Sequence, residues 1–116
     1  MKQGNILYVI VHESCVTEAA RKNSISIKVE KELERIKTKE KHIFIEEPLE
    51  EVSNLMPKPS QDLEVKVCGA YYGGEFWCIN RHQKALKKAG YKSKIHIPGS
   101  LIYNYNHYKR NCEEFI

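Results

Sequence analysis

Residues 63–97 read LEVKVCGAYYGGEFWCINRHQKALKKAGYKSKIHI, and this stretch decides the fold. It opens with Leu63–Cys68, which predicts a strand. A helical pattern follows from about Gly74 to Ala89, and Gly90 is expected to end that helix as a C-terminal cap. Lys92–Ile97 alternates between polar and apolar residues and predicts an edge strand. A strand, a helix and a second strand in this order indicate a parallel pair with a right-handed crossover.

The same alternation of strands and helices extends toward the N-terminus. Asn5–His12 is a continuous apolar run, which suits a strand buried on both faces of a parallel sheet. Residues from about 17 to 40 predict one helix, although the alternation within 25–29 leaves a short strand as the alternative. His42–Ile45 predicts another strand, and Pro48 begins a short predicted helix. The apolar stripe of the long helix consists of Ile25, Val29, Leu33 and Ile36.

The order of these elements is β-α-β-α-β-α-β, which predicts a single α/β domain over residues 1–116. We expect a Rossmann-like, three-layer α/β/α arrangement with about four parallel strands. A strand order of 2-1-3-4 fits this arrangement. Pro98-Gly99 is expected to stop the last strand. Residues 100–116 would then form a polar, aromatic tail that can serve as an interaction arm.

Composition limits the class of protein. The chain of 116 residues has 41% hydrophobic and 29% charged residues, a globular balance rather than a disordered one. The net charge of +4 permits an anionic partner but does not require one. The longest apolar run, Ile6–Val11, is too short to span a membrane and lacks the pattern of a signal peptide. We therefore expect a cytoplasmic protein with reduced cysteines and no membrane association.

A site is expected at the carboxyl ends of the strands, because ligands of open parallel sheets bind there, near the point where strand order reverses. His12, Glu13 and Cys15 follow the first strand, and Cys68 ends the third. A thiol, an imidazole and a carboxylate at one edge suit nucleophilic chemistry or a metal site. The alternative for each cysteine is core packing. No local ligand pair has standard zinc spacing, so we expect neither a metal nor a cofactor.

Cys78 has the strongest case among the cysteines. It falls in the first turn of a predicted helix, where the partial positive charge and the free N–H groups stabilise a thiolate. It also lies on the inner stripe of that helix, so burial explains it equally well. The preceding glycines indicate a possible cradle of backbone N–H groups for an anion. The predicted ligand-binding residues are Gly69, Gly73, Gly74 and Trp77.

Residues 63–97 also resemble part of the isochorismatase-like hydrolases, which include the nicotinamidases. The shared pattern is a strand, a Gly-containing turn, a Cys at the start of a helix, then Gly-Tyr and another strand. The resemblance implies that Cys78 is the nucleophile of a cysteine hydrolase acting on a small amide or ester. Members of that family have an Asp at the end of the first strand. VIVHES stands there in this chain, so His12 or Glu13 would act as the base. Their catalytic Lys has only Lys58 as a nominal counterpart.

Three functions follow from these observations. The first is a non-catalytic module that binds a small molecule or assembles, and we expect a homo-oligomer. The second is the cysteine hydrolase, with Cys78 as nucleophile. The third, less favoured, is nucleic-acid binding, since tyrosines for stacking follow a cluster of basic residues. The basic cluster consists of Arg81, Lys84, Lys87, Lys88, Lys92 and Lys94. In the first function, the tail is instead expected to dock onto a second copy through Tyr103, Tyr105 and Tyr108 beside Lys109 and Arg110.

Overall fold

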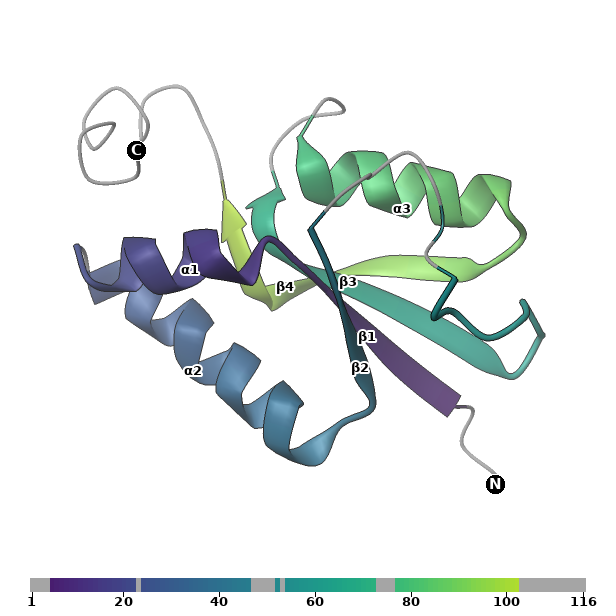
Figure 1. Cartoon of the computed structure of the whole chain (residues 1–116), viewed down its shortest axis with the longest axis horizontal. Helices are drawn as coiled ribbons and strands as arrows, with labels where there is room; N and C mark the ends of the chain where they lie inside the picture. Colours follow the sequence, from purple (N-terminus) through teal and green to yellow (C-terminus); the bar gives the residue numbers. More distant parts are fainter. Residues whose placement is uncertain (1–4, 23, 47–51, 53, 73–76, 103–116) are drawn as a thin grey trace.

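A four-stranded parallel sheet forms the centre of the computed structural model (Figure 1). The structure describes residues 5–22, 24–46, 52, 54–72 and 77–102. The sheet has the order β2-β1-β3-β4, and each neighbouring pair is parallel. The predicted fold class and strand order are therefore confirmed. The strands are β1 (Asn5–Val11), β2 (His42–Ile45), β3 (Leu63–Tyr72) and β4 (Lys92–Ile102).

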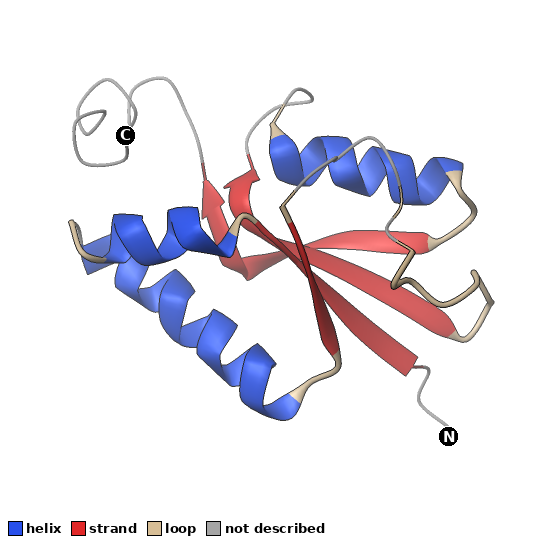
Figure 2. Cartoon of the chain, in the orientation of Figure 1, coloured by secondary structure: helices blue, strands red, loops and turns tan. Residues whose placement is uncertain are grey.

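Helices cover both faces of the sheet (Figure 2). Helix α3 (Cys78–Lys88) lies on one face, while α1 (Glu13–Ala20) and α2 (Ser24–Lys39) lie on the other. Successive side chains of a strand point to opposite faces, so each buried strand must supply two cores. In β1, Val9 belongs to the core under α3 and Ile10 to the core under α1 and α2. This explains why β1 is a continuous apolar run.

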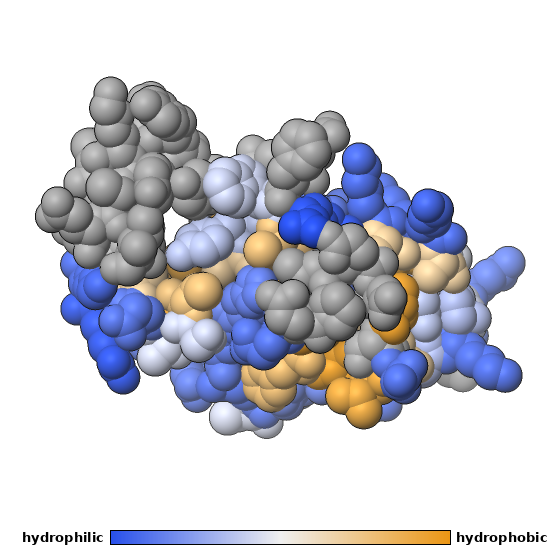
Figure 3. Space-filling model, turned by 45° about the horizontal axis from the view of Figure 1, so that its top comes forward, coloured by the Kyte–Doolittle hydropathy of each residue, from blue (hydrophilic) through white to orange (hydrophobic). Residues whose placement is uncertain are grey.

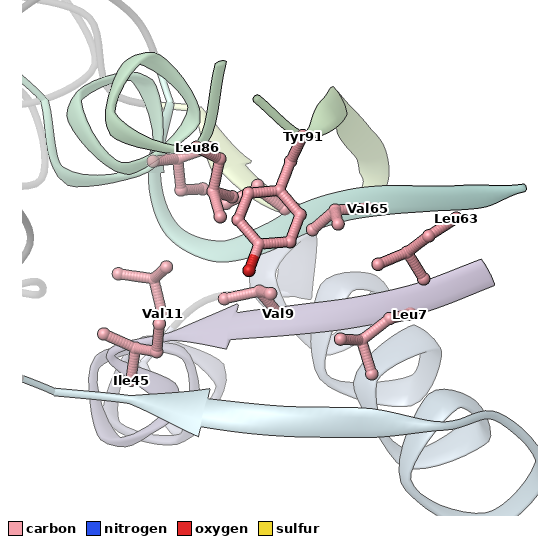
Figure 4. Packing of buried hydrophobic residues seen from close by; sticks show 10 residues of the cluster. Leu7, Val9, Val11, Ile45, Leu63, Val65, Leu86 and Tyr91 are labelled. Atoms are coloured by element: carbon pink, nitrogen blue, oxygen red, sulfur yellow. The ribbon is translucent and has the colours of Figure 1, made fainter. Parts of the chain in front are cut away.

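The core under α3 joins the helix to the sheet on that side (Figure 4). Val9 and Val65 from neighbouring strands lie beneath Leu86 of α3, and each of these side chains is fully buried. Burial of one such side chain contributes roughly 1.5–3 kcal/mol. The remaining buried members are Leu7, Val11, Ile45, Leu63, Val67, Ile79 and Tyr91.

Helix α3 ends as its sequence predicts. Gly90 has φ +98°, its N–H donates to the carbonyl of Lys87, and the Tyr91 N–H donates to the carbonyl of Leu86, both at 3.0 Å. These two bonds form a Schellman motif, which satisfies carbonyls that the helix leaves open. The predicted cap at Gly90 is confirmed. The cap also turns Tyr91 into the core, where its hydroxyl donates to the Pro57 carbonyl at 2.5 Å.

The helical region between β1 and β2 differs from the prediction. Two helices, α1 and α2, occupy the place of the single helix expected over about 17–40. Helix α1 begins directly after β1, at Glu13, and its buried residues are Val16 and Ala19. The apolar stripe that predicted the helix belongs to α2 alone, so it could not indicate that a separate helix, α1, precedes it. The short helix predicted from Pro48 lies largely outside the described residues, and Asn54–Met56 form a turn.

Strand β4 also differs, because it continues through Pro98-Gly99 to Ile102. Val67 of β3 pairs with Ile95, whereas Gly69 pairs with Ser100, so β4 carries extra residues between these pairs. The prediction that Pro98 stops the strand is wrong. Proline is tolerated in an edge strand where a bulge removes the need for its N–H. The bulge places residues 96–99 beside α2, where His96 contacts Glu32.

Candidate functional site

The carboxyl edge of the sheet has the geometry of a switch point. From β1 the chain passes through α1 and α2 to β2 on one side, and β3 continues through α3 to β4 on the other. The crevice of an open α/β sheet lies where such connections diverge, between β1 and β3. Val11, the last residue of β1, pairs with Ile45 of β2 and Gly69 of β3. The residues that follow these positions therefore border one edge.

His12 is fixed at this edge in a left-handed backbone conformation, with φ 48° and ψ 55°. Its N–H donates to the carbonyl of Ile45, and its carbonyl accepts from the N–H of Cys15, both at 3.0 Å. This region costs a residue with a Cβ roughly 1–2 kcal/mol, and such strain is concentrated at functional sites. The neighbouring strand and the first turn of α1 therefore hold a backbone that the residue would not adopt alone.

The imidazole of His12 faces the end of β2. Its Nδ1 lies 3.1 Å from Oε2 of Glu46, and the side chain of His12 is 17% exposed against 59% for Glu46. A carboxylate on one ring nitrogen orients the imidazole and fixes the direction in which the other ring nitrogen points. Glu46 directly follows β2, which neighbours β1, and this position marks it in the sequence as a residue of the same edge, although no role was predicted for it.

Glu13 belongs to the contact between α1 and α2. Its Oε2 lies 2.6 Å from Nζ of Lys37, and Lys37 also pairs with Glu34 at 2.8 Å. Hydrogen bonds from Lys37 to these carboxylates raise the pKa of the ammonium, with the bond to Glu13 the largest cause. The carboxylate thus stabilises the junction of two helices. A role for Glu13 as base of Cys78 remains a prediction.

The cysteines are divided between the layers. Cys68 is fully buried in the core under α1 and α2, and its Sγ lies 3.7 Å from the carbonyl of Val9. Burial raises the pKa of Cys68 to about 12. Cys15 is half-buried, and burial together with Glu46 raises its pKa as well. Both thiols are disfavoured as nucleophiles. Cys68 thus packs in the core, and Cys112 lies outside the described residues.

Trp77 and Cys78 begin α3. Trp77 is the extended N-cap residue, with φ −79° and ψ 152°, and Cys78 is the first residue of the helix. The predicted place of Cys78 in the first turn is confirmed. Its half-buried side chain packs against the core under α3, opposite the layer that contains Cys68. Cys78 therefore combines the two features that the sequence predicts, a helix N-terminus and contact with the core.

Gly69 has a steric reason to be glycine. Its φ is +107°, and a Cβ at this position would lie 2.0 Å from the carbonyl oxygen of Val11. No side chain fits in that space, so β1 and β3 approach closely only because residue 69 lacks one. The predicted role of Gly69 in an anion cradle is not needed to explain it. Gly73 and Gly74 lie outside the described residues.

Two further observations concern the described part of the chain. No group of three or more His, Cys, Asp or Glu side chains is arranged there to hold a metal ion. Among the same residues, none of the helices has both the length and the apolar character needed to cross a membrane.

The fold and this edge define an open parallel α/β domain with a switch point between β1 and β3. Comparison of the chain with family models, with curated proteins and with solved structures finds no match. The resemblance of residues 63–97 to the isochorismatase-like hydrolases therefore remains an expectation from sequence.

Proposed function

We propose that this chain is a non-catalytic module that binds a small polar molecule at the switch point, with His12 as the central contact. The observation that carries the proposal is the strained backbone of His12, which follows β1 and so borders the switch point, with its imidazole held by Glu46 at the end of β2. Strain of this kind persists where the surroundings fix a side chain for a task. Glu46 orients the imidazole, and α3, whose N-cap is Trp77, covers the opposite face of the sheet from α1.

A thermal-shift screen of small polar compounds tests this proposal. A ligand present at about 100 times its Kd stabilises the protein by about 2.7 kcal/mol, which raises Tm by several degrees. We expect the shift to disappear in His12→Asn, because asparagine tolerates the left-handed backbone but lacks the imidazole. Thr38→Ala, an exposed change on α2, is the control that should retain the shift. Shifts that persist in His12→Asn would contradict the proposal.

The second candidate is a cysteine hydrolase with Cys78 as nucleophile. The position of Cys78 at the N-terminus of α3 favours it, because the helix dipole stabilises a thiolate there. Selective alkylation of Cys78 in the folded protein below pH 7, with Cys78→Ser as the blank, would favour the hydrolase. Alkylation of Cys78 that occurs only after unfolding would rule out the hydrolase.

Assembly is the other part of the proposed role. Hydrophobic side chains reach the surface beside hydrophilic ones (Figure 3). Phe44, on β2, an edge strand of the described sheet, is 43% exposed. An edge strand with an exposed aromatic side chain suits pairing with a second copy. We propose a homo-oligomer built through β2, in a cytoplasmic setting where the cysteines stay reduced.

A further inference from the structure

A row of side chains crosses the face of the sheet that α1 and α2 occupy. Lys66 of β3 is in register with Tyr8 of β1 on one side and with Lys94 of β4 on the other. Val65 and Val67 point into the core under α3, so Lys66 between them points to the opposite face. The two lysines therefore stand side by side on one face of adjacent strands.

The helices leave this part of the face accessible. Lys94 is exposed and Lys66 is half-buried. Figure 1 shows β3 and β4 extending beyond α2 toward the right of the view. Tyr8, beside Lys66 on β1, is 5% exposed, and Nζ of Lys66 lies over its ring, 5.9 Å from the centroid. The accessible surface of the row is therefore positive charge over a buried aromatic ring.

Two nearby carboxylates, those of Glu32 and Glu40, are bound by Arg35. Both oxygens of Glu32 accept bonds from Arg35, at 2.8 and 2.9 Å, and Glu40 accepts another from Arg35 at 3.0 Å. Glu64 lies two residues before Lys66 on the same face of β3, in register with Lys92, so the basic side chains outnumber it there. Within the described residues, no carboxylate forms an ion pair with Lys66 or Lys94.

The row has a cost that the fold does not require. Like charges directly opposite on neighbouring strands destabilise a sheet. A lysine on an edge strand protects the sheet from aggregation, which accounts for Lys94. It does not account for Lys66, because β3 is an inner strand, and the contact of Lys66 with the Tyr8 ring does not remove its repulsion from Lys94. An anion bound across the two ammonium groups would remove the repulsion.

We propose that Lys66 and Lys94 form a docking surface for the phosphate backbone of single-stranded nucleic acid. The lysines contact phosphates and not bases, so binding is independent of nucleotide sequence. Charge complementarity selects an anionic partner. The row offers point charges in place of the apolar centre that a protein partner needs, and lysine suits a phosphate in many orientations. This surface is separate from the switch point and from the lysines of α3.

Fluorescence anisotropy with a labelled oligothymidylate tests the inference. We expect binding at low salt, weakened at least about 10-fold by Lys66→Gln/Lys94→Gln. The slope of log affinity against log salt should fall by about 1.4, because each phosphate that a lysine no longer neutralises removes about 0.7. Lys84→Gln/Lys88→Gln removes the same charge from exposed positions of α3 and should change affinity less than about twofold.

Three outcomes would overturn the inference: no binding at low salt, an equal loss in the α3 control, or tighter binding of a labelled polyglutamate peptide. Thermal unfolding of each variant checks the fold. Relief of repulsion should leave the double variant at least as stable as the parent. Lys94→Gln alone, at an exposed position, provides a second measurement and should weaken binding about threefold or more.

Discussion

At the scale of single residues, His12 is the most informative position. Its left-handed backbone lies in a region that histidine enters more often than most residues, yet still at a cost. The backbone bonds to Ile45 and Cys15 hold the conformation, so the strain is independent of the imidazole. This separation allows the cost of the backbone to be measured without the contribution of the side chain.

The measurement compares His12→Ala with His12→Gly, since both remove the imidazole and its contact with Glu46. Glycine adopts φ 48° without the clash that alanine meets. We expect His12→Gly to be the more stable of the two by about 1 kcal/mol, although glycine normally loses more entropy on folding. Urea unfolding gives both free energies. Equal stability, or an advantage for alanine, would show that the backbone is not strained.

Two glycines with positive φ provide a second comparison. Gly69→Ala places a Cβ 2.0 Å from a backbone oxygen, whereas the nearest atom to a Cβ at Gly90 is 3.8 Å away, on Pro59. We expect Gly90→Ala to cost about 1–2 kcal/mol from backbone strain alone. Gly69→Ala should cost at least about 3 kcal/mol, or prevent folding, because β1 and β3 must separate. Urea unfolding of the two variants decides this. A similar loss of stability in both variants would mean that β1 and β3 can move apart at Gly69 to make room for the Cβ.

At the scale of elements, the β4 bulge is tied to α2 by a charged network. Nε2 of His96 lies 2.5 Å from Oε2 of Glu32, and Arg35 binds the same carboxylate. The hydrogen bonds from Arg35, then those from His96, lower the pKa of Glu32 to about 2. A lowered carboxylate pKa stabilises the fold above the value in the unfolded chain, about 4.5, and that contribution is lost as pH falls toward 2.

Glu32→Gln should therefore lose stability in a pH-dependent manner. Near pH 7 we expect a loss of about 2 kcal/mol, with allowance for solvent screening. The difference from the parent protein should shrink below about pH 4.5 and vanish near pH 2. Urea unfolding across this range measures it, with Glu30→Gln on the same helix as the control. A difference that stays constant with pH would mean that the charge of Glu32 contributes nothing.

The elements also show where sequence patterns carry information. The parallel order could be predicted because apolar strands alternate with helical stripes, and Gly90 marked the end of α3 correctly. The break between α1 and α2 could not be predicted, since the apolar stripe from Val29 to Ile36 belongs only to the second helix. The extension of β4 past Pro98 depends on a bulge and on its contact with α2. Those are tertiary features that local alternation does not encode.

For the candidate site, too, some features could be predicted from the sequence and others could not. Its location at the carboxyl edge follows from strand order, and the place of Cys78 at a helix start could be predicted from the glycines before it. Core packing of Cys68 was an expectation from the sequence and is what the structure has, whereas the ion pair of Glu13 with Lys37 could not be predicted, because it depends on which faces of α1 and α2 meet. The predicted strand order placed the ends of β1 and β2 side by side, but the contact of His12 with Glu46 also depends on the left-handed backbone of His12, which no sequence pattern indicates.

At the scale of the whole molecule, the proposed assembly makes a direct prediction. Phe44→Lys places a charge on the exposed face of β2, so it should convert an oligomer into monomers. Sedimentation equilibrium measures the mass of both proteins. Ile27→Lys, at a 39% exposed position on α2, is the control that should leave the oligomer intact. A monomeric parent protein, or an oligomer that survives Phe44→Lys, would refute assembly through β2.

The central claim is that a small molecule binds at the switch point, and amide chemical shifts test it most directly. A compound found in the thermal screen would be titrated into the ¹⁵N-labelled protein and into His12→Asn. We predict that the largest shifts fall on Val11–Cys15, Glu46 and Trp77–Ile79, and that affinity drops at least about 10-fold in the variant. Shifts centred on any other face, with affinity unchanged in His12→Asn, would contradict the account.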